Sequence, residues 1–470
     1  MVSGSGALPV ADGDHANCPH RRSISDILTH PPYQMRLRLP KYHGAEWLQS
    51  RLPTTVEPWL DGNKHLLRHR QGGSAKTRHR LKQLLKEHRW QWPQRDICFI
   101  SDLHADADAL FAALIASGGI KKTGAADEMF HLTKQGRAML FIFGGDFFEK
   151  GPSNLRLLRA VKLMIDRGAR VRILAGNHDI RVLFGMQCAG RVDDPLNSHF
   201  FIRMGRKAIP FLCEIRDNYL KNSTDLPSDK ECRTLLFPHA NWRRQFTKQT
   251  ANMLSPNALA NEIEKIERNS RRFAQQCAKS GLSLAEAYAA ARKWQQLFLS
   301  KRGEFSWFFK QMKLVYRKGS FLFVHAGVDD LFAASLHHNG VATINRQFKK
   351  QLAESPVKFY YGAEANAIRT KYRSGDRKLT ARGSFLLHTA GIHALVHGHR
   401  NLHRGQRIAL RKSMLHFECD VTLDIHSRHH EGLSGLGGGV TIIQPEQRIL
   451  GISSDYQHIK LFDNGVIHAK

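Results

Sequence analysis

The sequence predicts an α/β protein in which a parallel sheet is flanked by helices. The first observation is that the apolar runs DICFISDLH, MLFIFGGD and RVRILAGNHD are typical of buried strands, with an amphipathic helical segment between each pair. The second is their order, β-α-β-α-β, because strands joined by single helices pair most economically in parallel. The third is that each apolar strand ends in acidic, imidazole or amide side chains.

Residues 1–93 are expected to form a basic, helical N-terminal extension. Its positive charge is densest from Lys64 to Trp90, where Glu87 is the only acidic residue. Three leucines recur there at helical spacing: Leu81, Leu84 and Leu85. This pattern favours a solvated basic helix packed on the main domain, and the alternative is a binding site for nucleic acid or another polyanion.

The remaining chain divides into three expected segments. Residues 94–190 hold the first strands of the core, and residues 191–315 show long helical patterns without strands, which predicts a helical insert or cap. Residues 316–470 return to the core with the strands GSFLFVHAG and HALVHGH and a hairpin in GGGVTIIQPEQRILGISSD. A further helical stretch, from about 340 to 395, separates the first two of these strands.

Composition indicates a soluble, cytoplasmic protein. The chain has 470 residues, of which 42% are hydrophobic, and shows neither a signal-peptide pattern nor a membrane span. Its seven cysteines include no CxxC pair, which suits reduced thiols. The formal charge of +30 would attract polyanions such as nucleic acid or acidic membrane surfaces, but it says nothing about chemistry.

Polar side chains gather at the ends of the predicted strands. They are Asp102, His104, Asp146, Asn177, His178, Asp179, His325 and His399. Any one of these motifs alone is more often a helix cap, a turn or a satisfied core histidine. Because ligands bind at the carboxyl ends of parallel strands, we expect the whole set to converge on one site.

The mixture of side chains predicts a divalent metal site. Carboxylates, neutral imidazoles and an amide suit Mn²⁺, Fe or Zn²⁺ better than Mg²⁺ or Ca²⁺. There are more ligands than one open ion can use, whereas two ions with a bridging carboxylate leave room for water and a phosphoryl oxygen. We therefore expect two divalent ions, with Mn²⁺ preferred and Fe or Zn²⁺ as alternatives.

The ordered set DxH, GD, GNHD, HAG and GHxN resembles the calcineurin-like metallophosphoesterase superfamily. The spacing after GNHD and the HGHR form are most similar to its phosphoprotein-phosphatase-like branch. The resemblance covers roughly residues 95–190 and 318–445, and it implies an αββα sandwich. In this chain the sandwich would carry a helical insertion and the basic helical N-terminal extension.

The resemblance also implies a role for each motif residue. Asp102 and His104 would hold the first ion, Asn177, His325 and His399 the second, and Asp146 would bridge both. A water acidified by the two ions would attack phosphorus in line. His178 would be the general acid that protonates the leaving oxygen, with a carboxylate partner that in this chain is Glu149.

Several positions depart from the family pattern. Glu149 stands where relatives have Asp, and Lys150, a candidate phosphate binder, stands where they have Arg. The motif GHRN lacks the second histidine of GHxH, so Asn401 is a possible weak ligand.

Three other features are open or expected to be structural. Arg181 and Arg400 are candidates for contacting substrate phosphate, with ordinary surface arginines as the alternative. HSRHHEG, residues 426–432, is expected to be an exposed loop that binds nothing.

The function that this pattern favours is hydrolysis of phosphate monoesters, on a phosphoprotein or a small molecule. The positive charge favours the alternative of a phosphodiesterase or nuclease. Glu149 and Asn401 permit a third reading, an inactive module that binds polyanions. We also expect the helical insert to overhang the site and limit which substrates enter.

Overall fold

The computed structural model describes residues 37–59, 74–220 and 226–465, and its strands form two large sheets and one small hairpin. Sheet A has the order β1 (Thr55–Pro58), β14 (His458–Asp463), β13 (Arg448–Ser453), β12 (Gly439–Gln444), β2 (Ile97–Ile100), β5 (Leu140–Phe143) and β6 (Arg170–Ile173). Sheet B has the order β10 (Arg407–Arg411), β11 (Met414–Glu418), β9 (Ala394–His397), β8 (Phe321–Val324) and β7 (Val315–Lys318). The hairpin pairs β3 (Ile120–Lys122) with β4 (Phe130–Leu132).

The two sheets pack face to face, because successive side chains of the central strands enter different cores. In β2, Ile97 and Phe99 belong to the core between the sheets, while Cys98 and Ile100 belong to the outer core. Strand β8 alternates in the same way, and the Phe99 and Phe323 rings lie 5.9 Å apart across the two sheets. The strands therefore read as continuous apolar runs, since both of their faces are buried.

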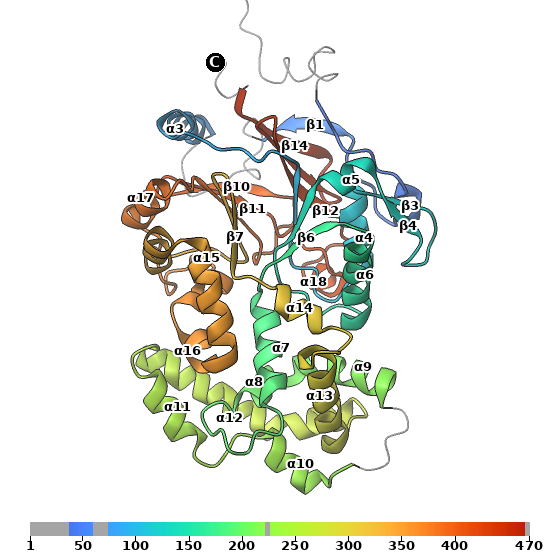
Figure 1. Cartoon of the computed structure of the whole chain (residues 1–470), viewed down its shortest axis with the longest axis vertical. Coiled ribbons are helices and arrows are strands. Elements are labelled where there is room, and N and C mark those ends of the chain that lie inside the picture. The colour runs from blue at the N-terminus through green and yellow to red at the C-terminus, as the bar shows by residue number, and fades with distance from the viewer. Residues whose placement is uncertain (1–36, 60–73, 221–225, 466–470) are drawn as a thin grey trace, which may run out of the picture.

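Helices cover the outer faces of this sandwich (Figure 1). Beside sheet A lie α4 (Ala107–Ala116), α5 (Lys134–Ala138) and α6 (Asn154–Asp166), and beside sheet B lie α15 (Asp330–Glu354) and α17 (Ala381–Thr389), while α16 (Pro356–Tyr361) lies between α15 and the helices of the insert. The predicted α/β fold, an αββα sandwich, is confirmed. The predicted parallel pairing of the first three strands is also confirmed, since β5 pairs with both β2 and β6 in parallel.

Helices alone occupy the described residues between β6 and β7, at one end of the molecule (Figure 1). They are α7 (Asn177–Cys188), α8 (Phe200–Met204), α9 (Ile209–Tyr219), α10 (Asp229–Leu236), α11 (Trp242–Thr250), α12 (Pro256–Lys279), α13 (Leu284–Leu299) and α14 (Ser306–Gln311). Ser283 and Glu286 form a capping box that starts α13. The buried side chains of these helices belong to the same core as α4 and α6.

The described N-terminal residues pair and pack with the two sheets. Strand β1 pairs in parallel with β14, and Trp59 is fully buried in the core between the sheets. In α3 (Ser74–Glu87), the three leucines predicted to face the main domain are buried in the same core. The described N-terminal residues therefore pack against the sandwich, while residues 1–36 and 60–73 lie outside the described part.

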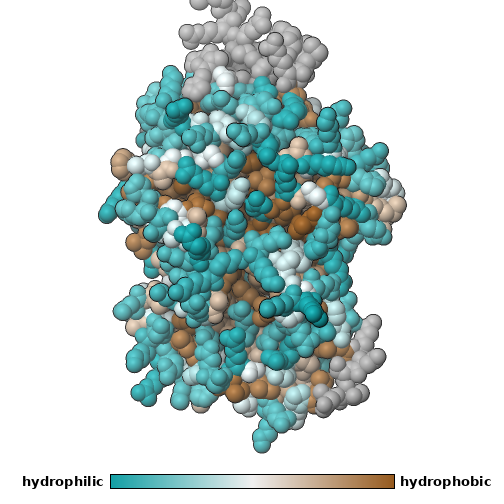
Figure 2. All heavy atoms as spheres, in the orientation of Figure 1, coloured by the Kyte–Doolittle hydropathy of each residue, from teal (hydrophilic) through white to brown (hydrophobic). Residues whose placement is uncertain are grey.

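The surface is mostly hydrophilic on the face shown in Figure 2. Among the described helices, none combines the length and the apolar character that crossing a membrane requires.

Candidate metal centre

The predicted ligands come together because each follows the carboxyl end of a strand. Asp102 follows β2, Asp146 follows β5, Asn177 begins α7 just after β6, and His325 and His399 follow β8 and β9. Three neighbouring strands of sheet A, β2, β5 and β6, and two neighbouring strands of sheet B, β8 and β9, thus bring their polar ends to one place.

Tight backbone turns aim these side chains inward. Asp102, His104, Asp146 and His399 all have positive φ, between 44° and 69°, a conformation that is unfavourable for residues other than glycine. Strain of this kind concentrates at functional sites. The glycine of the GNHD motif, Gly176, is also required, because a Cβ there would lie 2.1 Å from the Asp146 amide nitrogen.

Two groups of ligand atoms share Asp146. One contains Asp102, Asp146, His325 and His399, and the other contains His104, Asp146 and His178; within each group the atoms lie within 4.8 Å of one another. Asp146 Oδ2 lies 3.5 Å from His325 Nε2 and 3.8 Å from His104 Nε2. Asn177 Oδ1 lies 3.2 Å from His325 Nε2. A carboxylate between two sets of ligands is the arrangement that a dinuclear site requires.

The outer nitrogens of the imidazoles make backbone contacts that orient the rings. His325 Nδ1 lies 2.8 Å from the Gly144 carbonyl oxygen, His104 Nδ1 lies 3.3 Å from that of Phe148, and His399 Nε2 lies 3.0 Å from that of Arg369. A carbonyl oxygen can only accept, so each of these nitrogens carries a proton and the other nitrogen of each ring is the one directed inward. Metal-bound histidines are typically held in this way, so the residues fit a pair of divalent ions.

The charges of the cluster favour a cation. Burial would lower the pKa of His325, but the carboxylates of Asp146 and Asp102 outweigh burial and raise its pKa to about 10. Burial would likewise raise the pKa of Asp146, yet His325, His178 and His104 hold it well below its usual range. Burial, with help from Lys150, keeps the pKa of His104 well below its usual range, so that ring is neutral as a metal ligand must be.

His178 has the carboxylate partner that the sequence predicted. Its Nδ1 lies 2.7 Å from Glu149 Oε2, and its Nε2 lies 4.0 Å from Asp146 Oδ2. Arg181 forms an ion pair with the same Glu149 oxygen. Glu149 is buried and has φ of 68°, so a strained turn carries the longer side chain to His178.

Lys150 reaches from the centre to a neighbouring cleft. Its Nζ lies 2.8 Å from His104 Nε2 and donates to Ser427 Oγ at 3.2 Å. The cleft has a volume of about 690 Å³, and its walls come from the first helices of the insert, the turn after β5 and α18 (Ile425–His430). Lys150, Arg206 and Lys207 give it a positive lining.

The structure shows the surroundings of three further residues that the sequence singled out, two arginines and one asparagine. Arg181 and Arg400 are not surface arginines: their side chains are 14% and 10% exposed, and Arg400 pairs with the buried Glu418. Asn401 is exposed, and its Nδ2 donates to Glu431 Oε1 at 2.9 Å, a placement that gives no support to a role as a ligand.

The expected loop HSRHHEG was wrong, because residues 425–430 form helix α18. Its cap is Asp424, whose carboxylate accepts from the Ser427 amide at 2.8 Å. Arg428 fixes the helix through a buried pair with Asp455, 27 residues away in the sequence. The histidines remain exposed, as expected.

Two carboxylates near the centre were not assigned a role from the sequence. Asp179 accepts hydrogen bonds from the amides of Asp146, Phe147 and Gly176 at 2.7 to 2.9 Å, and so joins the turn after β5 to the start of α7. Asp420 is buried, and burial with the Asp102 charge raises its pKa well above the usual range. Asp179 was visible in the GNHD motif, whereas nothing in the local sequence marked Asp420.

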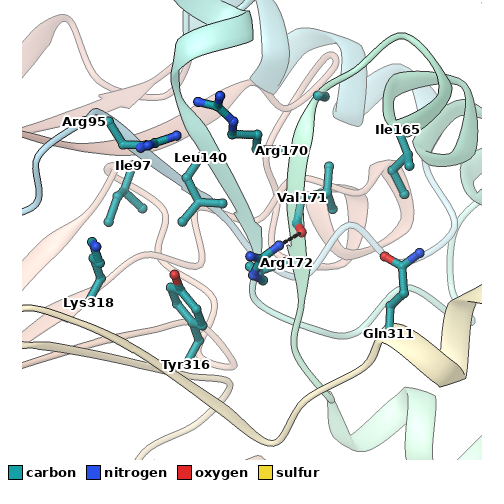
Figure 3. A pocket seen from close by; sticks show the side chains of 11 residues that line it. Arg95, Ile97, Leu140, Ile165, Arg170, Val171, Arg172, Gln311, Tyr316 and Lys318 are labelled. Atoms are coloured by element: carbon teal, nitrogen blue, oxygen red, sulfur yellow. Dashed lines mark hydrogen bonds between the residues drawn. The ribbon is translucent and has the colours of Figure 1, made fainter.

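A second cavity lies at the opposite end of the strands and is not part of the centre (Figure 3). Its volume is about 550 Å³, and its lining includes Ile97, Leu140 and Arg170, which begin β2, β5 and β6. Arg95, Arg172 and Lys318 also line it, but no Asp, Glu, His or Asn does so. The cavity therefore lacks every type of side chain that makes up the predicted metal site.

A family comparison agrees with the resemblance that the ordered motifs indicated. Residues 96–249 match the model of the calcineurin-like phosphoesterase family, which confirms the resemblance indicated by the ordered motifs. No curated protein sequence is similar enough to match the chain.

Three of the solved structures that are similar to the chain are described as phosphatases. A cold-active protein tyrosine phosphatase is 13% identical with a TM-score of 0.40, covering 79% of this chain and 80% of its own. A related structure from a psychrophilic Shewanella species is 13% identical with a TM-score of 0.35, covering 78% and 80%. A protein serine/threonine phosphatase from Saccharomyces cerevisiae is 10% identical with a TM-score of 0.34, covering 83% and 87%.

Proposed function

We propose that the chain is a metal-dependent phosphoesterase that hydrolyses phosphate monoesters. The observation that carries this proposal is the position of Asp146, whose buried carboxylate belongs to both ligand groups. His178 and its partner Glu149 lie beside it. A dinuclear site with an adjacent proton donor has the parts that phosphoryl transfer to water requires.

We assign the side chains to two ions as the family pattern implies, although the Asp102 carboxylate lies in the same group of ligand atoms as His325 and His399. Asp102 and His104 would hold the first ion, Asn177, His325 and His399 the second, and Asp146 both. When bound, two such ions polarise the phosphoryl oxygens and acidify the water that attacks phosphorus. Mn²⁺ fits this mixture of oxygen and nitrogen ligands, as do Fe and Zn²⁺.

His178 would deliver a proton to the leaving oxygen from Nε2. With its Nδ1 proton donated to Glu149, the ring presents Nε2 to the centre. Burial, together with Lys150 and Lys207, lowers the pKa of His178 to about 4 despite the nearby Asp146 charge. An entering phosphate dianion would raise this pKa, because its negative charge stabilises the imidazolium. Arg181, which pairs with Glu149, would hold that carboxylate in place.

The substrate would enter through the cleft beside Lys150. Burial and the charges of Arg181 and Lys150 lower the pKa of Lys207 to about 8, which reflects crowding of positive charge. An anionic substrate relieves that crowding, so we assign Lys150 and Lys207 to the phosphate group. The insert supplies Lys207, Arg206 and Phe211 to the cleft and would thereby limit access.

A phosphodiesterase is the second candidate, and the net charge of +30 favours it for nucleic acid substrates. The two kinds of substrate differ in charge. A monoester is a dianion, and it presents three phosphoryl oxygens to the cations of the cleft. We favour the monoester because the positive lining is concentrated next to the metal centre.

The test is hydrolysis of p-nitrophenyl phosphate and bis-p-nitrophenyl phosphate by metal-stripped protein supplied with Mn²⁺. Asp146→Asn should abolish metal-dependent turnover, with Asp166→Asn, an exposed aspartate on α6, as the matched control. Preference for the monoester would support the proposal, and preference for the diester would favour the second candidate. Folded protein without turnover under any metal would refute both and favour the polyanion-binding module.

A further inference from the structure

Three histidines form a second cluster outside the candidate metal centre. His88 follows α3, His388 lies on α17, and His393 immediately precedes β9. One nitrogen of each lies within 4.8 Å of those of the other two. Because His399 follows the other end of β9, this strand separates the cluster from the metal centre. The proposed function uses none of the three.

Two of these rings turn their Nδ1 atoms toward each other. His388 Nδ1 lies 3.0 Å from His393 Nδ1. His388 Nε2 lies 3.2 Å from the Ser413 carbonyl oxygen, and the His393 ring is hydrogen-bonded to the Arg89 backbone. With protons donated to these backbone groups, the Nδ1 lone pairs are the atoms that a cation between the two rings would bind.

The candidate metal centre also contains two imidazole nitrogens that face each other. There His325 Nε2 and His399 Nδ1 lie 3.1 Å apart, and the outer nitrogen of each ring lies against a backbone carbonyl. Burial lowers the pKa values of His388 and His393 to about 4, with the His88 charge contributing, so both rings are in the neutral form that binds metals.

We propose that His88, His388 and His393 bind one Zn²⁺ or a similar borderline divalent ion. Imidazole nitrogens suit such ions, and an all-histidine set excludes Mg²⁺ and Ca²⁺. In a tetrahedral set, Zn–N bonds of about 2.1 Å place two ligand nitrogens about 3.4 Å apart, so nitrogens now within 4.8 Å of one another need to approach by up to about 1.4 Å.

His88 must turn for this to happen, because its ring stacks on the other two. Its centroid lies 4.0 Å from that of His388 and 4.6 Å from that of His393, with nearly parallel planes. His88 is only partly buried, so its ring can turn toward the solvent side of the cluster. A water would complete a tetrahedral set.

The ion would fasten the N-terminal residues to sheet B. Near His88, Trp90 and Trp92 pack on Phe321 of β8, with ring centroids 5.8 Å and 5.1 Å away. Metal binding would add a fixed connection to this contact, since an ion that binds only the folded state stabilises it. The role assigned to this site is structural.

The test measures zinc per chain and the zinc-dependent change in Tm of the full chain after chelation and reloading. His88→Ala, His388→Ala and the exposed control His338→Ala are compared with the unmodified protein. We expect the first two to lose one zinc per chain and the additional Tm increase, while the control keeps both. Mn²⁺-dependent phosphatase activity should persist in all variants, which separates this result from any failure of the proposed function.

The proposal would be overturned if His88→Ala and His388→Ala bound as much zinc as the unmodified protein and showed the same zinc-dependent increase in Tm. Should His388→Ala fail to fold, His88→Ala decides the outcome, because that side chain is only partly buried.

Discussion

Replacing Glu149 with Gln tests whether His178 acts as a proton donor. The substitution keeps the size of the side chain but removes the negative charge that accepts the Nδ1 proton at 2.7 Å and pairs with Arg181. A neutral amide no longer stabilises the imidazolium, and it can present its NH₂ group to Nδ1 instead. General acids contribute about 10²- to 10⁴-fold, and loss of an orienting partner costs about 10- to 100-fold.

The size of the loss should depend on the leaving group. Phenyl phosphate needs a proton on its leaving oxygen, so we expect kcat/KM to fall about 100-fold, or about 2.7 kcal/mol of transition-state stabilisation. p-Nitrophenolate leaves readily without protonation, so its kcat/KM should fall less than about tenfold. Metal content and Tm measured on the same samples serve as controls, because Arg181 loses its counter-charge. Equal losses on both substrates would refute the proton-donor role of His178.

Three further predictions concern the cleft and the stability of the fold. Lys207→Ala should raise KM for a monoester about tenfold with little change in kcat, since it removes ground-state binding; an unchanged KM would contradict its assignment to phosphate. Leu84→Ala should lower the free energy of unfolding by about 2–4 kcal/mol, whereas the exposed Lys86→Ala on the same helix should change it little; similar urea midpoints would contradict the packing of α3. Arg203 outweighs the effect of burial and lowers the pKa of Glu262 from 4.5 to about 2, so this pair stabilises the fold above pH 4.5 and the gain is lost as pH falls toward 2. At about 1.4 kcal/mol per pKa unit, Glu262→Gln should remove up to about 3 kcal/mol of acid-dependent stability, and an unfolding free energy that falls as steeply as in the unmodified protein would refute this.

The strands that the sequence predicted are those whose local pattern is strong. The runs around β2, β5, β8 and β9 are apolar on both faces and end in polar motifs, so periodicity and turn residues located them. The pairing of β1 with β14 could not be read in this way, because Thr55–Pro58 contains a proline and is stabilised by a partner about 400 residues away. The hairpin of β10 and β11 was also missed; it is fixed partly by the buried Glu418 and its arginines.

For the candidate site, too, the features set by the local sequence could be predicted and those set by distant segments could not. The ligands were predictable because one topological rule places the ends of neighbouring strands together. The environment of each charge was not predictable, since it depends on partners from other segments. Arg400 forms an ion pair with Glu418 on β11, and Arg428 forms one with Asp455, which follows β13.

The candidate metal centre contains residues that the fold holds in unfavourable backbone conformations. Asp102, His104, Asp146 and His399 each have positive φ, at a cost of about 1 kcal/mol or more per residue. Buried strands on one side and the Asp179 carboxylate on the other hold these turns, so the ligands are in place before any ion binds. Ordering the chain therefore offsets little of the free energy of ion binding. Glu149, which is one methylene longer than the Asp of the family pattern, also has a positive φ of 68°. This backbone conformation brings its carboxylate to His178 despite the longer side chain.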